Sequence, residues 1–271
     1  MKQPVVDYRK LRFSNLRSPE YSHLLWLLGW VGYFILYFLT ENLIPAEKCH
    51  PVWCPLDDIV PFCEGFAIAY VFWYALIVIS LVYFALYNLD NFRNLQKYII
   101  ITQVVAMAVY ILYPTRQDLR PTEFPRDNVL TALMGLIYSF DTNTGVCPSL
   151  HVAYSLGIAS TWLREKSACL AWKIFVVVAV VLICLSVAFV KQHSVVDIFA
   201  AIPVCILAEY LVFFQKRKKP HKKKPVEAIP RVFMLQQGNA CQLAFFQSLF
   251  VPDTGLDLAD VGAAQHQHGK S

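Results

Sequence analysis

Charged side chains are scarce in this sequence. Only 16% of its 271 residues are Asp, Glu, Lys or Arg, whereas 57% are hydrophobic and the mean hydropathy is +0.46. A soluble domain usually has about 25% charged residues, so the composition argues against a soluble protein and indicates one that lies in a bilayer. The net charge is only +5. Because no basic surface interleaved with aromatic residues is evident, we expect no nucleic-acid partner.

Internal repeats and long low-complexity linkers are also missing. The length therefore predicts one membrane domain with an extension at each end. We expect a cytoplasmic N-terminal arm over residues 1–22, a membrane domain over 23–214, and a basic, largely disordered cytoplasmic tail over 215–271. The lysine-rich run 216–224 favours contact of this tail with anionic headgroups.

A zinc pattern is absent from the region before residue 65, although Cys49, Cys54 and Cys63 lie close together there. Their spacing does not match that of a zinc site. Disulfides form outside the cytoplasm, so the sequence allows either a Cys49–Cys54 or a Cys54–Cys63 disulfide and does not decide between them. The acidic residues of this region either contact the functional site or are solvated, and we favour solvation; they are Asp57, Asp58 and Glu64.

Six apolar runs predict six membrane crossings and hence an all-α, polytopic bundle. A spanning helix needs about 20 residues. The third and fourth runs are short, so we expect their outer ends to stop below the membrane surface, around a polar cavity. The first run is long enough to span and its leader is too long for a cleavable signal peptide, so we expect it to be retained. The six runs are Leu24–Ile44, Gly65–Tyr87, Tyr98–Tyr113, Pro148–Leu163, Ile174–Val190 and Ser194–Phe214.

Lysine and arginine are distributed unequally between the two predicted sides. With six crossings, four basic regions fall on one side, which the positive-inside rule makes cytoplasmic. They are the arm, the loop between the second and third crossings with Arg93 and Lys97, the loop between the fourth and fifth crossings, and the tail. The loop 114–146 breaks the trend, because Arg116, Arg120 and Arg126 fall on the opposite side. An anionic ligand would explain this, because guanidinium groups suit phosphate oxygens. Lipid-headgroup contacts or salt bridges are the alternative. The acidic residues available for such bridges are Asp118, Glu123 and Asp127.

The segment 147–151, Cys-Pro-Ser-Leu-His, follows this loop directly. A helix that begins here would have Pro148 in its first turn, where a missing N–H group costs nothing. The free N–H groups and the positive dipole end of that helix would form an anion site. Ser149 adds a hydrogen-bond donor, and His151 can exchange a proton near neutral pH.

His193 and Asp197 reach the same predicted face after the fifth crossing. Because they are four residues apart, they would lie on one side of a helix. A carboxylate at this spacing can hold one imidazole nitrogen and leave the other free to attack. The alternative is a polar pair that caps the sixth helix. Ionisable residues in a membrane domain are costly and usually functional, which favours the first interpretation.

Three motifs in this order resemble those of the type 2 phosphatidic acid phosphatase superfamily. The first is Arg120-Pro121; the family's lysine seven residues earlier is Tyr113 here, and Arg116 is the candidate replacement. The second, residues 148–151, is similar to Pro-Ser-Gly-His except at Leu150, a change that resembles the inositol-phosphorylceramide and sphingomyelin synthase-like branches. The third has the family's serine, histidine and aspartate, while its arginine is replaced and Lys191 is the candidate for the lost charge. The residues of this third motif are Ser186, Val187, His193 and Asp197.

The resemblance implies a six-helix membrane fold and a two-step phosphoryl transfer that needs no metal or other cofactor. It implies that His193 attacks phosphorus, that Asp197 orients it, and that His151 protonates the leaving alkoxide and then activates water or an acceptor alcohol. The residues implied to bind phosphate are Arg116, Arg120, Ser149 and Lys191.

Three classes of function remain open at this point. We favour a phosphatase acting on a phosphatidic acid-like lipid or a polyprenyl diphosphate. Leu150 favours a lipid phosphotransferase instead. A non-catalytic lipid- or anion-binding protein or a transporter is the third class, for which Glu209 is the main membrane-embedded candidate. We expect a lipid substrate and a bacterial plasma membrane, with the site on the extracytoplasmic face, although a eukaryotic endomembrane and any oligomeric state remain open.

Overall fold

The computed structural model describes residues 3–215, all of which belong to one compact unit, Gln3–Pro225. This part of the chain is mostly helical. Short 3-10 turns precede or connect the helices, and two-residue strands β1 (His50–Pro51) and β2 (Thr115–Arg116) pair in parallel, with His50 opposite Thr115. The helices are α1 (Leu28–Leu43), α2 (Pro55–Ile59), α3 (Ala67–Tyr87), α4 (Leu89–Leu112), α5 (Val129–Phe140), α6 (Leu150–Arg164), α7 (Leu170–Phe189) and α8 (Val195–Glu209).

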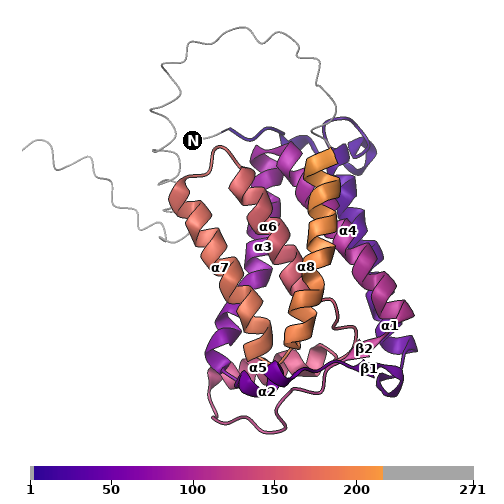
Figure 1. Ribbon diagram of the computed structural model, residues 1–271. Helices are drawn as coiled ribbons and strands as arrows, with labels where there is room; N and C mark the ends of the chain where they lie inside the picture. The colour runs from indigo at the N-terminus through magenta and orange to yellow at the C-terminus, as the bar shows by residue number, and fades with distance from the viewer. Residues whose placement is uncertain (1–2, 216–271) are drawn as a thin grey trace, which may run out of the picture. The chain divides into compact units, whose positions relative to one another are not determined.

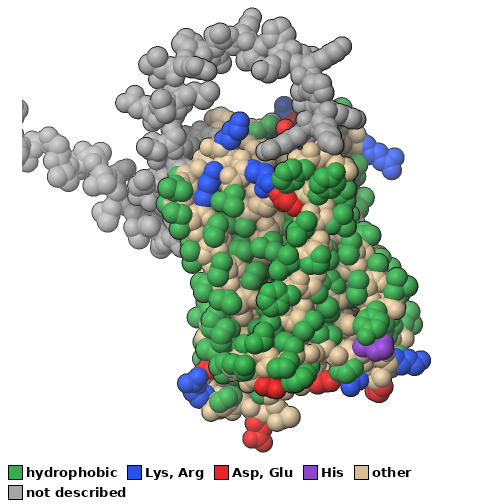
Figure 2. Space-filling view, in the orientation of Figure 1, with side chains coloured by type: hydrophobic (Ala, Val, Ile, Leu, Met, Phe, Trp, Pro, Cys, Tyr) green, Lys and Arg blue, Asp and Glu red, His purple; other side chains and the backbone are tan. Residues whose placement is uncertain are grey.

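Five helical segments are long and apolar enough to cross a membrane, which indicates an integral membrane protein. Figure 2 shows the corresponding broad apolar band, with charged side chains gathered towards its two ends. The fourth predicted crossing corresponds to α6, which has 15 residues and is too short to span by itself. The five segments are Ser22–Leu43, Glu64–Tyr87, Leu89–Leu112, Leu170–Phe189 and Val195–Phe214.

The third crossing is longer than the sequence pattern predicted. Helix α4 has 24 residues and begins at Leu89, so the prediction of a short third crossing was wrong. Asn88 accepts a hydrogen bond from the Asn91 backbone N–H and caps the helix directly after α3. Arg93 and Lys97, which we assigned to a loop, therefore lie in the first turns of α4.

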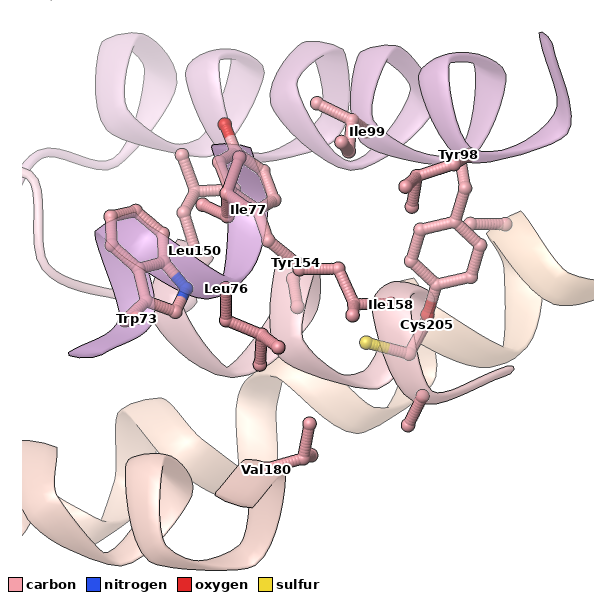
Figure 3. Packing of buried hydrophobic residues seen from close by; sticks show 14 of the residues in the cluster. Trp73, Leu76, Ile77, Tyr98, Ile99, Leu150, Tyr154, Ile158, Val180 and Cys205 are labelled. Carbon is pink, nitrogen blue, oxygen red and sulfur yellow. The ribbon is translucent and has the colours of Figure 1, made fainter. Parts of the chain in front are cut away.

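Helix α6 is largely enclosed by protein, and most of its residues are buried. It packs against α3, α4, α7 and α8. Its Tyr154 and Ile158 join Leu76 of α3 and Ile99 of α4 in the main buried cluster (Figure 3). A helix enclosed in this way can begin below the surface, because protein rather than lipid surrounds its ends.

One end of the bundle holds the short elements. Helices α2 and α5 and the two strands lie at the end where α6 and α8 begin (Figure 1). Helix α5 falls in the loop 114–146, where the sequence analysis predicted no helix; Asn128 caps it by accepting from the Leu130 and Thr131 backbone N–H groups. With 12 residues, α5 is too short to span. Helix α5 lies across this end of the bundle, next to the segments whose motifs resemble those of the family.

The N-terminal arm packs on the opposite end of the bundle. The Val5 backbone N–H donates to the Leu86 carbonyl, and the Tyr8 hydroxyl contacts both Ala85 and the buried His23. The predicted tail beyond Gln215 lies outside the described residues.

Candidate functional site

Two histidines and an aspartate meet where α7 ends and α6 and α8 begin. His193 Nδ1 lies 3.3 Å from Asp197 Oδ2, and His193 Nε2 lies 3.4 Å from His151 Nδ1. The carboxylate thus holds one nitrogen of the His193 ring and leaves Nε2 as the basic atom. The structure therefore brings together the three residues that the sequence analysis had assigned to catalysis.

The segment between α7 and α8 is a tight turn rather than a helix. His193 precedes α8, whose N-cap is Ser194, so His193 and Asp197 are not on one helix face as we expected. The Asp197 carboxylate reaches back to the Ser194 backbone N–H at 3.0 Å and contacts His193 as well. Asp197 therefore caps the start of α8 and also holds the imidazole of His193, so the two interpretations of this pair do not exclude each other.

His151 lies in the first turn of α6 against aromatic rings. Its ring centroid is 4.2 Å from that of Trp73 and 4.8 Å from that of Tyr70. The N-cap of α6 is Ser149, whose backbone N–H donates to the Asp197 carbonyl at 3.1 Å. Pro148 precedes the helix instead of lying in its first turn as predicted. The Ser149 bond ties the start of α6 to the start of α8, so the two histidines are held by connected elements.

Polar atoms without protein partners lie at this junction. Ser149 is fully buried, and neither its Oγ nor His151 Nε2 has a hydrogen-bond partner. No side chain caps the first turn of α6. Buried polar groups are normally hydrogen-bonded, and free N–H groups at a helix start attract anions. The arrangement is therefore suited to a small anionic group beside His151 and His193.

Arg120 approaches the site through Gln192, the residue before His193. One Nη atom of Arg120 donates to Gln192 Oε1 at 2.6 Å, and Gln192 Nε2 donates to Asp141 Oδ2 at 3.1 Å and to the Tyr70 hydroxyl at 3.3 Å. The Arg120 guanidinium also donates to backbone carbonyls after α5, whereas its buried Nε has no partner. Burial raises the pKa of the Asp141 carboxyl, although the nearby Arg120 opposes that shift.

Arg116 and Lys191 have protein partners of their own. Arg116 donates to the Ala46 carbonyl at 2.8 Å and to Asp118 at 3.0 Å. The Lys191 amine donates to the Asp57 and Val60 carbonyls at 2.7 and 2.5 Å, and burial lowers its pKa. Within residues 3–215, no hydrogen bond joins either side chain to His151 or His193. The structure thus gives both residues a role in holding loops together.

The favoured prediction that the acidic residues of the first outer loop are solvated is wrong for two of the three. Only Asp58 is exposed, whereas Asp57 and Glu64 are buried. Glu64 pairs with Arg126 and Asn128 at the start of α5, and Asp57 bonds to the turn that carries His193. Sequence spacing gave no signal for these contacts, because the partners lie more than 60 residues apart.

The cysteines of this end are free thiols, so neither predicted disulfide is present among the described residues. Cys147 lies beside Asp197, and burial together with that carboxylate raises the pKa of the Cys147 thiol to about 12. It is therefore protonated at neutral pH.

Glu209 lies at the far end of α8 and pairs with Arg164 and Ser160. This residue was the candidate for a transport path. Its contacts satisfy its charge within the protein.

No protein-family model, curated protein or solved structure matches this chain.

Proposed function

We propose that this protein is a membrane enzyme that transfers a phosphoryl group from a lipid phosphate to water through a phosphohistidine. The observation that carries the proposal is the series Asp197–His193–His151, in which each side chain contacts the next at the start of two helices. A nucleophile, a group that orients it and a second proton carrier are the parts that such a reaction needs.

In the first step, His193 Nε2 forms a bond to phosphorus while the bond from phosphorus to the lipid oxygen breaks. Protonated His151 gives its proton to that oxygen, and the lipid leaves as an alcohol, or as a lipid monophosphate when the substrate is a diphosphate. In the second step, water attacks phosphorus, His151 takes its proton, and the nitrogen–phosphorus bond breaks to release phosphate. A phosphorus atom in line with Nε2 would sit about 3–3.5 Å away before attack, so the two rings must separate to admit it.

The charge on the phosphoryl oxygens would be stabilised by groups that lack protein partners. These are the Ser149 hydroxyl and the N–H groups at the start of α6, because donors fixed in a water-poor site stabilise developing charge strongly. Arg120 would contribute through its free Nε. Arg116 and Lys191 would support the surrounding loops rather than contact phosphate.

The proposal extends to the membrane arrangement. With α6 counted as a sixth, protein-enclosed crossing, the site lies at the end opposite the basic N-terminal arm. We infer that this end faces away from the cytoplasm, as in a bacterial plasma membrane with an extracytoplasmic active site. A phosphatidic acid-like lipid or a polyprenyl diphosphate could then reach the site from the outer leaflet.

Phosphate release from purified protein tests the proposal. In detergent, with phosphatidic acid or a polyprenyl diphosphate and a chelator present, we expect turnover that His193→Ala reduces to background. Asp118→Asn, at an exposed position of the same end, is the matched control and should retain activity. Unchanged activity in His193→Ala would contradict the assignment of the nucleophile.

The same assay distinguishes hydrolysis from transfer. Added diacylglycerol, ceramide or inositol would yield a phosphorylated product if the acceptor were an alcohol. Hydrolysis predicts that free phosphate remains the main product. Binding of the lipid without any product, at all acceptor concentrations, would favour a non-catalytic protein.

A further inference from the structure

Asp57 connects the first outer loop to the turn that carries His193. The residue lies in α2, is 3% exposed, and is separated from that turn by more than 130 residues. Its carboxylate accepts from the Ser194 hydroxyl at 2.5 Å and from the Val195 backbone N–H at 2.8 Å. Those two donors directly follow His193.

The Asp57 carboxylate is also held by the first outer loop, to which it belongs. Asp57 Oδ2 accepts from the Cys54 backbone N–H at 2.8 Å, which caps the start of α2. It therefore cannot move freely towards solvent, because its two oxygens accept hydrogen bonds from both segments. The loop 54–57 and the turn 193–195 are thus joined through one carboxylate.

A second connection runs in the opposite direction. Lys191 precedes His193 by two residues, and its amine donates to the Asp57 and Val60 carbonyls. The Lys191 backbone has φ of 52°, a left-handed conformation that non-glycine residues rarely adopt. Such a conformation persists when surrounding contacts over-determine it. Contacts with the first outer loop therefore hold the turn on both sides of His193.

We propose that Asp57 is a positioning residue for the nucleophile, an inference that rests on the proposed phosphoryl transfer. Asp57 touches neither histidine in the structure. It fixes Ser194 and Val195, and through them the direction from which the imidazole faces His151. Because a misplacement of about 1 Å can lower a rate by about 10²-fold, loss of this carboxylate should slow chemistry more than it weakens substrate binding.

Asp57→Asn tests this inference, with the neighbouring exposed Asp58→Asn as its matched control. In the phosphate-release assay we expect kcat of Asp57→Asn to fall by about 10- to 100-fold while KM changes by less than about threefold. Asp58→Asn should match the unmodified protein in both parameters. The fraction of folded protein, measured by thermal unfolding in detergent, is used to express kcat per folded molecule.

Ser194→Ala provides a second variant, because it removes one Asp57 partner with a small change of volume. We expect it to lower kcat in the same direction, and the double variant Asp57→Asn/Ser194→Ala to lose no more than Asp57→Asn alone. A purely structural role would reduce the folded fraction and leave kcat per folded molecule unchanged, and that result would overturn the inference. Absence of turnover in the unmodified protein would instead contradict the proposed function itself.

Discussion

At the scale of single residues, most polar side chains around His193 already have hydrogen-bond partners within the protein, and only a few polar atoms have none. Asp197 contacts the Ser194 backbone N–H and the His193 ring. Gln192 forms hydrogen bonds with Arg120, Tyr70 and Asp141. The buried atoms near His193 that have no partner are Ser149 Oγ, His151 Nε2, Asp197 Oδ1 and Arg120 Nε. An anion that binds here would find donors whose partners do not have to be displaced first.

Asp141 makes the pH dependence of stability testable. Burial raises the pKa of its carboxyl in the folded protein. Folding is therefore favoured by the protonated form of Asp141. This stabilisation is fully present below the pKa of about 3.9 that the carboxyl has in the unfolded chain, and it is lost as the pH rises through the higher pKa of the folded protein. As the pH rises above about 4, the unfolding temperature of the unmodified protein should decline relative to that of Asp141→Asn, measured in detergent. Parallel curves would contradict this, and Asp118→Asn, which is exposed, should follow the unmodified protein.

At the scale of helices, the site depends on the close approach of α4 and α6. Gly157 of α6 faces the ring of Tyr98 on α4, and an added Cβ would lie 2.5 Å from that ring. Tyr98 is itself buried and lies beside Cys205 of α8 in the core (Figure 3). A separation of α4 from α6 would therefore disturb the packing that also supports α8.

Gly157→Ala should destabilise the protein by about 1–3 kcal/mol, because overpacking a filled core forces its neighbours to shift. The expected result is a lower unfolding temperature in detergent. Gly32→Ala is the matched control, since an added Cβ there meets no atom within 4 Å, and it should be neutral or slightly stabilising. Equal unfolding temperatures for the two variants would contradict the described packing of α6.

The same scale shows what sequence patterns could predict. Apolar runs located the long helices, and the motifs identified His151, His193 and Asp197, because ionisable groups are rare enough in a membrane domain to stand out. Helix α4 was underestimated, because its first turns are polar and depend on the Asn88 cap. Gln192 was missed and Asp57 was expected to be solvated, because the contacts of both residues join distant segments. For the same reason, Lys191 was assigned to phosphate, although its amine binds two carbonyls.

At the scale of the whole molecule, the two ends of the bundle differ in character. The end with α2 and α5 carries the histidines, whereas the opposite end carries the basic N-terminal arm and the start of α4 (Figure 1). Basic residues favour the cytoplasmic side. This asymmetry is the basis of the proposed orientation, in which the proposed active site faces the other leaflet.

Labelling in intact cells tests the orientation. Asp118 and Arg9 are exposed at opposite ends, with 56% and 91% of their side chains accessible. A membrane-impermeant maleimide should label Asp118→Cys above the level of the unmodified protein, and label Arg9→Cys only after the membrane is permeabilised. The reverse pattern would place the site on the cytoplasmic side.

The most direct test of the central claim is to trap the phosphorylated enzyme. The protein is mixed with a lipid phosphate labelled with ³²P, quenched in base, and digested for peptide mapping. We predict an acid-labile, base-stable label on the peptide that contains His193, absent from His193→Ala. Turnover without any trapped label at His193, or a label on another residue, would contradict the account.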